Sequence, residues 1–221
     1  MSKLKFGFHN FLNAQPLLLP LLEMAESLDC EICIDSPSNL AERLGSGELD
    51  LAMIPSVEYL RKANIYKILR GAAIASCDKV DTVLFIAHKN LEDIQTIALD
   101  NRSKTSVALF HILFGGKLNS NVKTFVEDPN PEETLKKYDA ALLIGDPAFK
   151  VGSQFSDLTI YDLSHEWFIQ TGKPFVHAVI AVRPEIELPD GLIDAFQKIK
   201  VEGKKRIPEI AKFHSTILDI N

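Results

Sequence analysis

The sequence predicts an α/β protein built on largely parallel β-sheets, and three observations point to this class. Short apolar segments such as 4–8, 49–54 and 140–144 alternate with segments that have the periodicity of amphipathic helices. Several of the apolar segments are nearly continuous, as in strands that are buried on both faces of a parallel sheet. The chain has 221 residues, of which 46% are hydrophobic and 24% charged, and this suffices for one large domain or two small lobes.

The first third of the chain is expected to contain three strands and three helices. A strand over 4–8 leads through a polar turn to a helix over 17–28, because Pro16 suits the first turn of a helix. Pro20 is expected to lie in that first turn or to kink the helix. The next elements are a strand over 31–34, a helix capped within 36–39 and ended by Gly45 and Gly47, a strand over 49–54 and a helix over 57–62.

The remaining two thirds continue the alternation. Expected strands cover 72–75, 82–87, 96–99, 123–126, 140–144 and 175–182, and expected helical segments cover 91–94, 107–114, 131–137 and the residues from 192 onward. Two of these strands are able to carry the backbone between lobes. We therefore expect lobe one to comprise residues 1–85 with 178–221, and the inserted lobe two to comprise 86–177.

Composition narrows the function classes. The net charge of -6 makes the chain a poor candidate for nucleic-acid binding, which needs clustered Lys and Arg. No apolar run approaches the length of a membrane span. The apolar residues near the N-terminus are interrupted by Gly7, His9 and Asn10, unlike the core of a signal peptide. We expect a cytoplasmic protein with neither nucleic-acid nor membrane partners; the sequence leaves the oligomeric state open.

Neither the cysteines nor the histidines indicate a cofactor. Cys30 and Cys33 are three residues apart in an expected strand, so their side chains point to opposite faces and are unsuited to a shared metal or disulfide. The six histidines contain no pair with the helical spacing of metal ligands, and nucleotide-binding glycine loops are missing. We expect no metal and no cofactor.

Ligands of open α/β sheets bind beyond the carboxyl ends of the strands, and that rule selects four polar turns. These turns lie at 10–15, 55–56, 100–106 and 145–146. Asn13, in the first turn, is explained equally well by turn formation and by hydrogen bonding to a substrate. Asp146, in the last turn, is better explained as a helix cap than as a ligand contact.

The third turn carries the strongest signal for an anion site. Ser103, Thr105 and Ser106 lie at or before an expected helix N-terminus, where free N–H groups and the helix dipole favour an anion. Arg102 and Lys104 are expected to raise the local positive potential. A helix cap requires a single hydroxyl, so three hydroxyls in four positions favour anion binding over plain capping.

Five motifs together resemble a known family. The order and spacing of these motifs over about residues 4–180 resemble the chorismate dehydratases of menaquinone biosynthesis; the motifs are Phe11–Leu17, Gly47–Tyr59, Ile97–Ser106, Ala140–Asp146, and Trp167 with Thr171–Phe175. The resemblance implies a two-lobed type II periplasmic-binding-protein-like fold with a ligand cleft between the lobes. It implies a lyase that removes water from chorismate to give 3-[(1-carboxyvinyl)oxy]benzoate in the futalosine route.

The resemblance also implies roles for individual residues. Asn13 corresponds to the asparagine that the family ties to catalysis. The resemblance and the strand-end rule together predict the substrate-binding residues, which are Ser56, Thr82, Ser103, Thr105, Ser106, Gly145 and Asp146. The chain departs from the family at Asp78, whose carboxylate is expected to point outward if activity is kept.

The chemistry fits these residues. Chorismate is a dicarboxylate, and two anion sites, one per lobe, would hold it. Loss of the C3 proton and the C4 hydroxyl makes the ring aromatic, so the reaction needs mainly positioning and one proton removal. Asn13 has no useful pKa and is expected to orient a reacting group, while the base stays open. The alternatives are a non-catalytic binding protein for small carboxylates and 1,4-dihydroxy-6-naphthoate synthase.

Overall fold

The computed structural model describes residues 3–100, 102–127, 130–149, 151 and 157–218, and it confirms the α/β class. The chain forms two compact units. The first comprises Met1–Ile74 and Val176–Asn221, and the second comprises Ala75–Phe175. The division after Ile74 differs from the expected one after residue 85, because the strand Val83–Ala87 pairs within the second sheet.

The first unit contains a five-stranded sheet with the order β2-β1-β3-β10-β4. The strands are β1 (Leu4–Phe8), β2 (Cys30–Ile34), β3 (Leu51–Pro55), β4 (Lys67–Ser76) and β10 (Phe175–Val182). Strand β1 runs parallel to β2 and β3, whereas β10 is antiparallel to β3. The carboxyl ends of β1 and β3 therefore lie at the same edge of this sheet.

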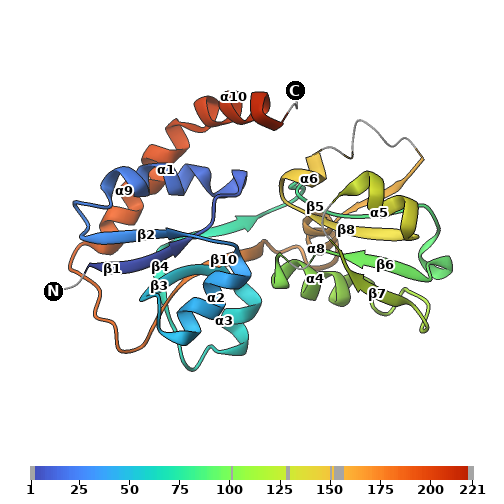
Figure 1. The fold of residues 1–221 in the computed structure, drawn as a ribbon, viewed down its shortest axis with the longest axis horizontal. Coiled ribbons are helices and arrows are strands. Elements are labelled where there is room, and N and C mark those ends of the chain that lie inside the picture. Colours follow the sequence, from blue (N-terminus) through green and yellow to red (C-terminus); the bar gives the residue numbers. More distant parts are fainter. Residues whose placement is uncertain (1–2, 101, 128–129, 150, 152–156, 219–221) are drawn as a thin grey trace. The chain divides into compact units, whose positions relative to one another are not determined.

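Helices cover both faces of the first sheet (Figure 1). On one face, α1 (Gln15–Met24) and α9 (Leu192–Lys205) bury a core with β1, β3 and β10. On the other, α2 (Pro37–Ser46) packs on the same strands. The unit also contains η1 (Leu12–Ala14), α3 (Ser56–Arg61) and α10 (Ile207–Leu218).

Local sequence signals explain two of these helices. Ser36 caps α2 by accepting a hydrogen bond from the Asn39 N–H, and Gly47 ends α2 with a φ of 86°, both in the expected segments. Pro20 lies inside α1, and α1 ends at Met24 rather than at residue 28.

Helices α1 and α9 are in direct backbone contact. A Cβ added to Gly203 of α9 would lie 1.5 Å from the carbonyl oxygen of Pro16 in α1.

The second unit contains a sheet with the order β7-β6-β8-β5-β9. Its strands are β5 (Val83–Ala87), β6 (Thr96–Leu99), β7 (Lys123–Val126), β8 (Ala140–Ile144) and β9 (Thr159–Asp162). Helices α4 (Lys104–Phe114) and α8 (Leu163–Thr171) cover one face, and α5 (Pro131–Lys137) and α6 (Asp146–Phe149) cover the other; η2 (Leu91–Asp93) follows β5. The sequence did not predict β9 or α8.

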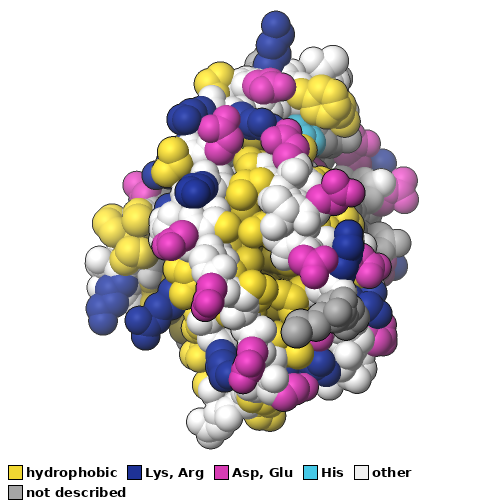
Figure 2. Space-filling model, turned by 90° about the vertical axis from the view of Figure 1, so that its left-hand side faces the viewer, with side chains coloured by type: hydrophobic (Ala, Val, Ile, Leu, Met, Phe, Trp, Pro, Cys, Tyr) yellow, Lys and Arg dark blue, Asp and Glu magenta, His cyan; other side chains and the backbone are white. Residues whose placement is uncertain are grey.

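One face of the molecule carries hydrophobic, acidic and basic side chains together (Figure 2). Figure 2 shows one face, where hydrophobic side chains lie between acidic and basic ones rather than beside a block of one charge sign. Within the described ranges, no helix combines the length and the apolar character that a membrane crossing requires.

Candidate functional site

Asn13 and Ser56 follow neighbouring parallel strands at one edge of the first sheet. Asn13 lies in η1, is exposed, and makes no side-chain hydrogen bond to any residue that the structure describes. Ser56 begins α3, and its hydroxyl donates to the Val176 carbonyl at 2.6 Å. The structure thus places both predicted residues at the edge where ligands of α/β sheets bind.

The turn that carries Asn13 is held without the Asn13 carboxamide. The Ala14 N–H donates to the Phe11 carbonyl at 2.9 Å, which closes η1. The buried Gln15 side chain donates to the Asn10 carbonyl at 2.8 Å. The carboxamide of Asn13 is therefore presented by a fixed turn and stays available for a ligand.

His9 lies directly after β1, and the spacing of the histidines, which bears only on metal binding, gives it no role in the sequence. The residue is 3% exposed. The ring centroid lies 5.9 Å from that of Phe8 and 5.1 Å from that of Phe11. Its Nδ1 is buried and lacks a hydrogen-bond partner among the described residues. Burial lowers the pKa of His9 from 6.5 to about 4, so the imidazole is neutral at pH 7.

The low pKa of His9 predicts a loss of stability in mild acid. The unfolded chain binds this proton near pH 6.5 and the folded chain only near pH 4. The contribution of neutral His9 is therefore present above pH 6.5 and is lost as the pH falls through 4, by at most about 3 kcal/mol. Urea unfolding of wild type and of His9→Phe at pH 7 and pH 4.5 measures it. Equal acid losses in both proteins would contradict this.

Six predicted residues meet at one edge of the second sheet. Strands β6 and β8 are parallel and end there, and the antiparallel strand β5 begins there. Gly145 donates its N–H to the Thr82 carbonyl at 2.7 Å, which joins the segments before β5 and after β8. The residues gathered at this edge are Thr82, Ser103, Thr105, Ser106, Gly145 and Asp146.

The hydroxyl-rich turn at 100–106 contains the N-cap of α4. Helix α4 begins at Lys104, earlier than the expected Val107, so Ser103 is its N-cap. The Ser103 hydroxyl oxygen accepts from the Ser106 N–H at 3.3 Å and from the Ser106 hydroxyl at 3.1 Å. Thr105 and Ser106 are only 2% and 1% exposed. Capping thus occupies Ser103 and Ser106, which the sequence had favoured as anion donors.

Arg102 supplies less positive potential than expected. Its guanidinium donates to the Asp100 carboxylate at 2.9 and 2.6 Å, and also to the Ile144 carbonyl. The Asp100 side chain is 2% exposed and accepts from the Ile144 N–H at 3.2 Å. The cation is therefore largely offset by a buried carboxylate that ties β6 to β8.

Gly145 has a backbone conformation that favours glycine. Its φ is 75°, and a Cβ added there would meet nothing within 4 Å. We expect Gly145→Ala to lower the free energy of unfolding by about 1–2 kcal/mol through backbone strain alone. Gly116 also has open space but no positive φ, so Gly116→Ala is the matched control. Urea unfolding measures both, and equal effects would contradict the prediction.

Asp162 and Asp78 organise the segment that leads to Thr82. The buried Asp162 carboxylate accepts from the N–H groups of Val80 and Asp81, both at 2.8 Å, and caps α8. Asp78 has a side chain 61% exposed and pairs with the His165 Nδ1 atom. That hydrogen bond lowers the pKa of Asp78. The carboxylate of Asp78 is thus directed at α8.

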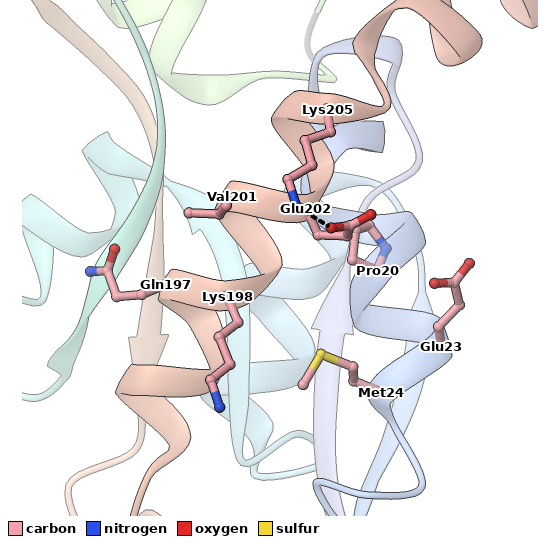
Figure 3. Close-up of a pocket in the computed structure, with 8 residues that line it drawn as sticks. All are labelled: Pro20, Glu23, Met24, Gln197, Lys198, Val201, Glu202 and Lys205. Atoms are coloured by element: carbon pink, nitrogen blue, oxygen red, sulfur yellow. Dashed lines mark hydrogen bonds and ion pairs between the residues drawn. The ribbon is translucent and has the colours of Figure 1, made fainter.

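A hollow of about 590 Å³ lies between α1 and α9 of the first unit (Figure 3). Three of its four charged lining side chains are in ion pairs, since Lys205 contacts Glu202 at 3.1 Å and Glu23 contacts Arg206 at 2.6 Å. None of the predicted site residues lines it; the lining residues are Pro20, Glu23, Met24, Gln197, Lys198, Val201, Glu202 and Lys205. It does not extend the site at the sheet edge.

Comparisons of the sequence with known proteins identify related proteins over most of the chain. A family model described as menaquinone biosynthesis matches residues 4–216. A chorismate dehydratase of Thermus thermophilus is 30% identical over an alignment of 200 residues, and the alignment covers 84% of this chain and 73% of that protein.

Two solved structures are similar in fold. Protein AF1704 of Archaeoglobus fulgidus has a TM-score of 0.70 at 16% identity, over 98% of this chain and 81% of that one. The periplasmic aliphatic sulphonate binding protein SsuA of Escherichia coli has a TM-score of 0.66 at 12% identity, over 100% of this chain and 80% of that one. The expected two-lobed periplasmic-binding-protein-like fold is confirmed.

Proposed function

The chain belongs to the menaquinone biosynthesis family, and from this premise we propose that it is a chorismate dehydratase, a carbon–oxygen lyase. The product would be 3-[(1-carboxyvinyl)oxy]benzoate, in the futalosine route and in the cytoplasm. The observation that carries the proposal is the 30% identity to the Thermus thermophilus chorismate dehydratase over 84% of the chain.

The first sheet edge would provide the reacting groups. Breaking the C3–H and C4–O bonds of chorismate makes its ring aromatic, so the enzyme has to position the substrate and help one proton and one hydroxyl leave. Asn13 suits the positioning role because its carboxamide is exposed, unpaired within the described residues and able to donate and accept hydrogen bonds. Ser56 would contact the substrate from the next strand of the same sheet.

The second sheet edge would bind a carboxylate of the substrate. The N-terminus of α4 favours an anion through its dipole, and Ser103 lies at that terminus. Gly145 leaves open space where a side chain would otherwise stand, which supports a close approach of a ligand to the backbone. Thr82 and Asp146 would complete this binding edge, and Thr105 and Ser106, which are 2% and 1% exposed, would support it from within α4.

Direct assay tests the proposal. Purified protein incubated with chorismate is expected to form the carboxyvinyl-oxybenzoate, identified by mass spectrometry, and heat-denatured protein serves as the control. Folded protein that binds chorismate but yields no product would instead be a binding protein.

A thermal-shift panel separates the alternative ligands, since only a true ligand stabilises the folded chain. The panel contains chorismate, cyclic dehypoxanthinyl futalosine and amino acids. Stabilisation by the futalosine derivative alone would indicate 1,4-dihydroxy-6-naphthoate synthase and contradict the proposal.

A further inference from the structure

His9 is a buried titratable residue in the segment that joins β1 to the turn of Asn13. The ring packs against the rings of Phe8 and Phe11, and the residue is only 3% exposed. Its Nδ1 is one of three buried side-chain nitrogens that lack a partner within the described residues; the others belong to Trp167 and Arg183. Of the three, only His9 lies between a strand end and the proposed reacting residue.

An unpaired nitrogen here calls for an explanation. Nearly all buried polar groups in folded proteins are hydrogen-bonded, and an unmade bond is costly. A phenylalanine would fill a similar apolar space between two aromatic rings without that cost. Nε2 has no described partner either, but it is not among the buried unpaired atoms, so it keeps contact with the surface. The imidazole therefore retains hydrogen-bonding capacity that the fold does not use.

The surroundings of His9 keep the imidazole uncharged. Desolvation alone lowers its pKa, and no charged group contributes. The aromatic neighbours Phe8 and Phe11 carry no charge. Asp35 donates its N–H to the Phe8 carbonyl, and its carboxylate is paired with Arg43 at 3.3 Å. The Asp35 carboxylate is thus engaged with Arg43 and Asn39 rather than with His9.

We propose that His9 contacts the substrate beside Asn13 and, as a neutral imidazole that carries its proton on Nε2, donates a hydrogen bond from Nε2 to the oxygen that leaves as water. This inference rests on the proposed dehydratase function. An uncharged imidazole and an uncharged carboxamide suit a hydroxyl better than a carboxylate, which would call for a cation. As the carbon–oxygen bond breaks, the oxygen gains negative charge, and a fixed N–H donor stabilises that charge more than it stabilises the bound substrate.

Two substitutions separate a catalytic contact from a packing role. His9→Phe keeps an aromatic ring and removes the donor, and His9→Gln keeps an N–H near the position of Nε2. We expect His9→Phe to lower kcat by about 10- to 100-fold with little change in KM, and His9→Gln to recover most of the rate. His111→Gln, at an exposed position of α4, is the matched control.

A second readout does not depend on turnover. The ¹⁵N resonances of the His9 ring, assigned by their loss in His9→Gln, are expected to shift when chorismate saturates the slow Asn13→Ala variant. Full activity of His9→Phe, or unshifted resonances with chorismate bound, would overturn the inference and leave the dehydratase function standing. Wild type that neither binds nor converts chorismate would overturn both.

Discussion

Asn13→Ala is expected to lower kcat for chorismate by about 100- to 1,000-fold while KM changes by less than about threefold. The reason is the geometry of the first turn. Its hydrogen bonds join Ala14 to Phe11 and Gln15 to Asn10, and none of them uses the Asn13 carboxamide. The substitution therefore removes a group that acts on the substrate and leaves the turn in place.

The control for this experiment is an asparagine of similar exposure without a proposed role. Asn121, before β7, is exposed, and Asn121→Ala is expected to keep wild-type kinetics. Steady-state assays of both variants, with circular dichroism to verify folding, measure the difference. An unchanged kcat in Asn13→Ala would remove Asn13 from the mechanism, and a rise in KM alone would reassign it to binding.

Gly203→Ala is expected to destabilise the protein by about 3–5 kcal/mol or to prevent folding. An added Cβ would lie 1.5 Å from the Pro16 carbonyl oxygen and 2.5 Å from its carbonyl carbon. Both atoms belong to the backbone of α1, so no side-chain rotation relieves the overlap. Helix propensity alone predicts the opposite sign, a gain of about 1 kcal/mol.

Gly45, in α2, provides the matched comparison. A Cβ there would lie 3.5 Å from the ends of the Lys62 and Tyr66 side chains, an ordinary contact distance. Gly45→Ala is therefore expected to be neutral or stabilising in thermal and urea unfolding. If Gly203→Ala unfolds at the same urea concentration as wild type, the close packing of α9 on α1 is contradicted.

The sequence was most informative where burial is complete. Strands β3, β5 and β8 consist of buried residues throughout, and their continuous apolar runs predicted them. Strand β9 is a partly exposed edge strand of four residues, and α8 buries few of its own residues. Neither carries a strong hydrophobic period, so tertiary contacts rather than local pattern define them.

The candidate site could be predicted by position but not in detail. The strand-end rule placed Asn13, Ser56 and Gly145 at sheet edges because it depends only on strand order. Whether a hydroxyl faces a ligand depends on the residue at which the helix starts. Helix α4 starts at Lys104 instead of the expected residue 107, so Ser103 is its cap and Ser106 is buried. The enclosure of His9 depends on rings that fold around it, which spacing does not reveal.

The position of β10 has a consequence for synthesis on the ribosome. This strand pairs with β3 in the first sheet, although the whole second unit separates the two in the chain. The second unit is continuous in sequence, so all of it emerges while the first sheet still lacks β10. One edge of β3 therefore stays unpaired while the ribosome synthesises about a hundred further residues. We expect chaperones to shield that edge, and the first unit to finish folding last.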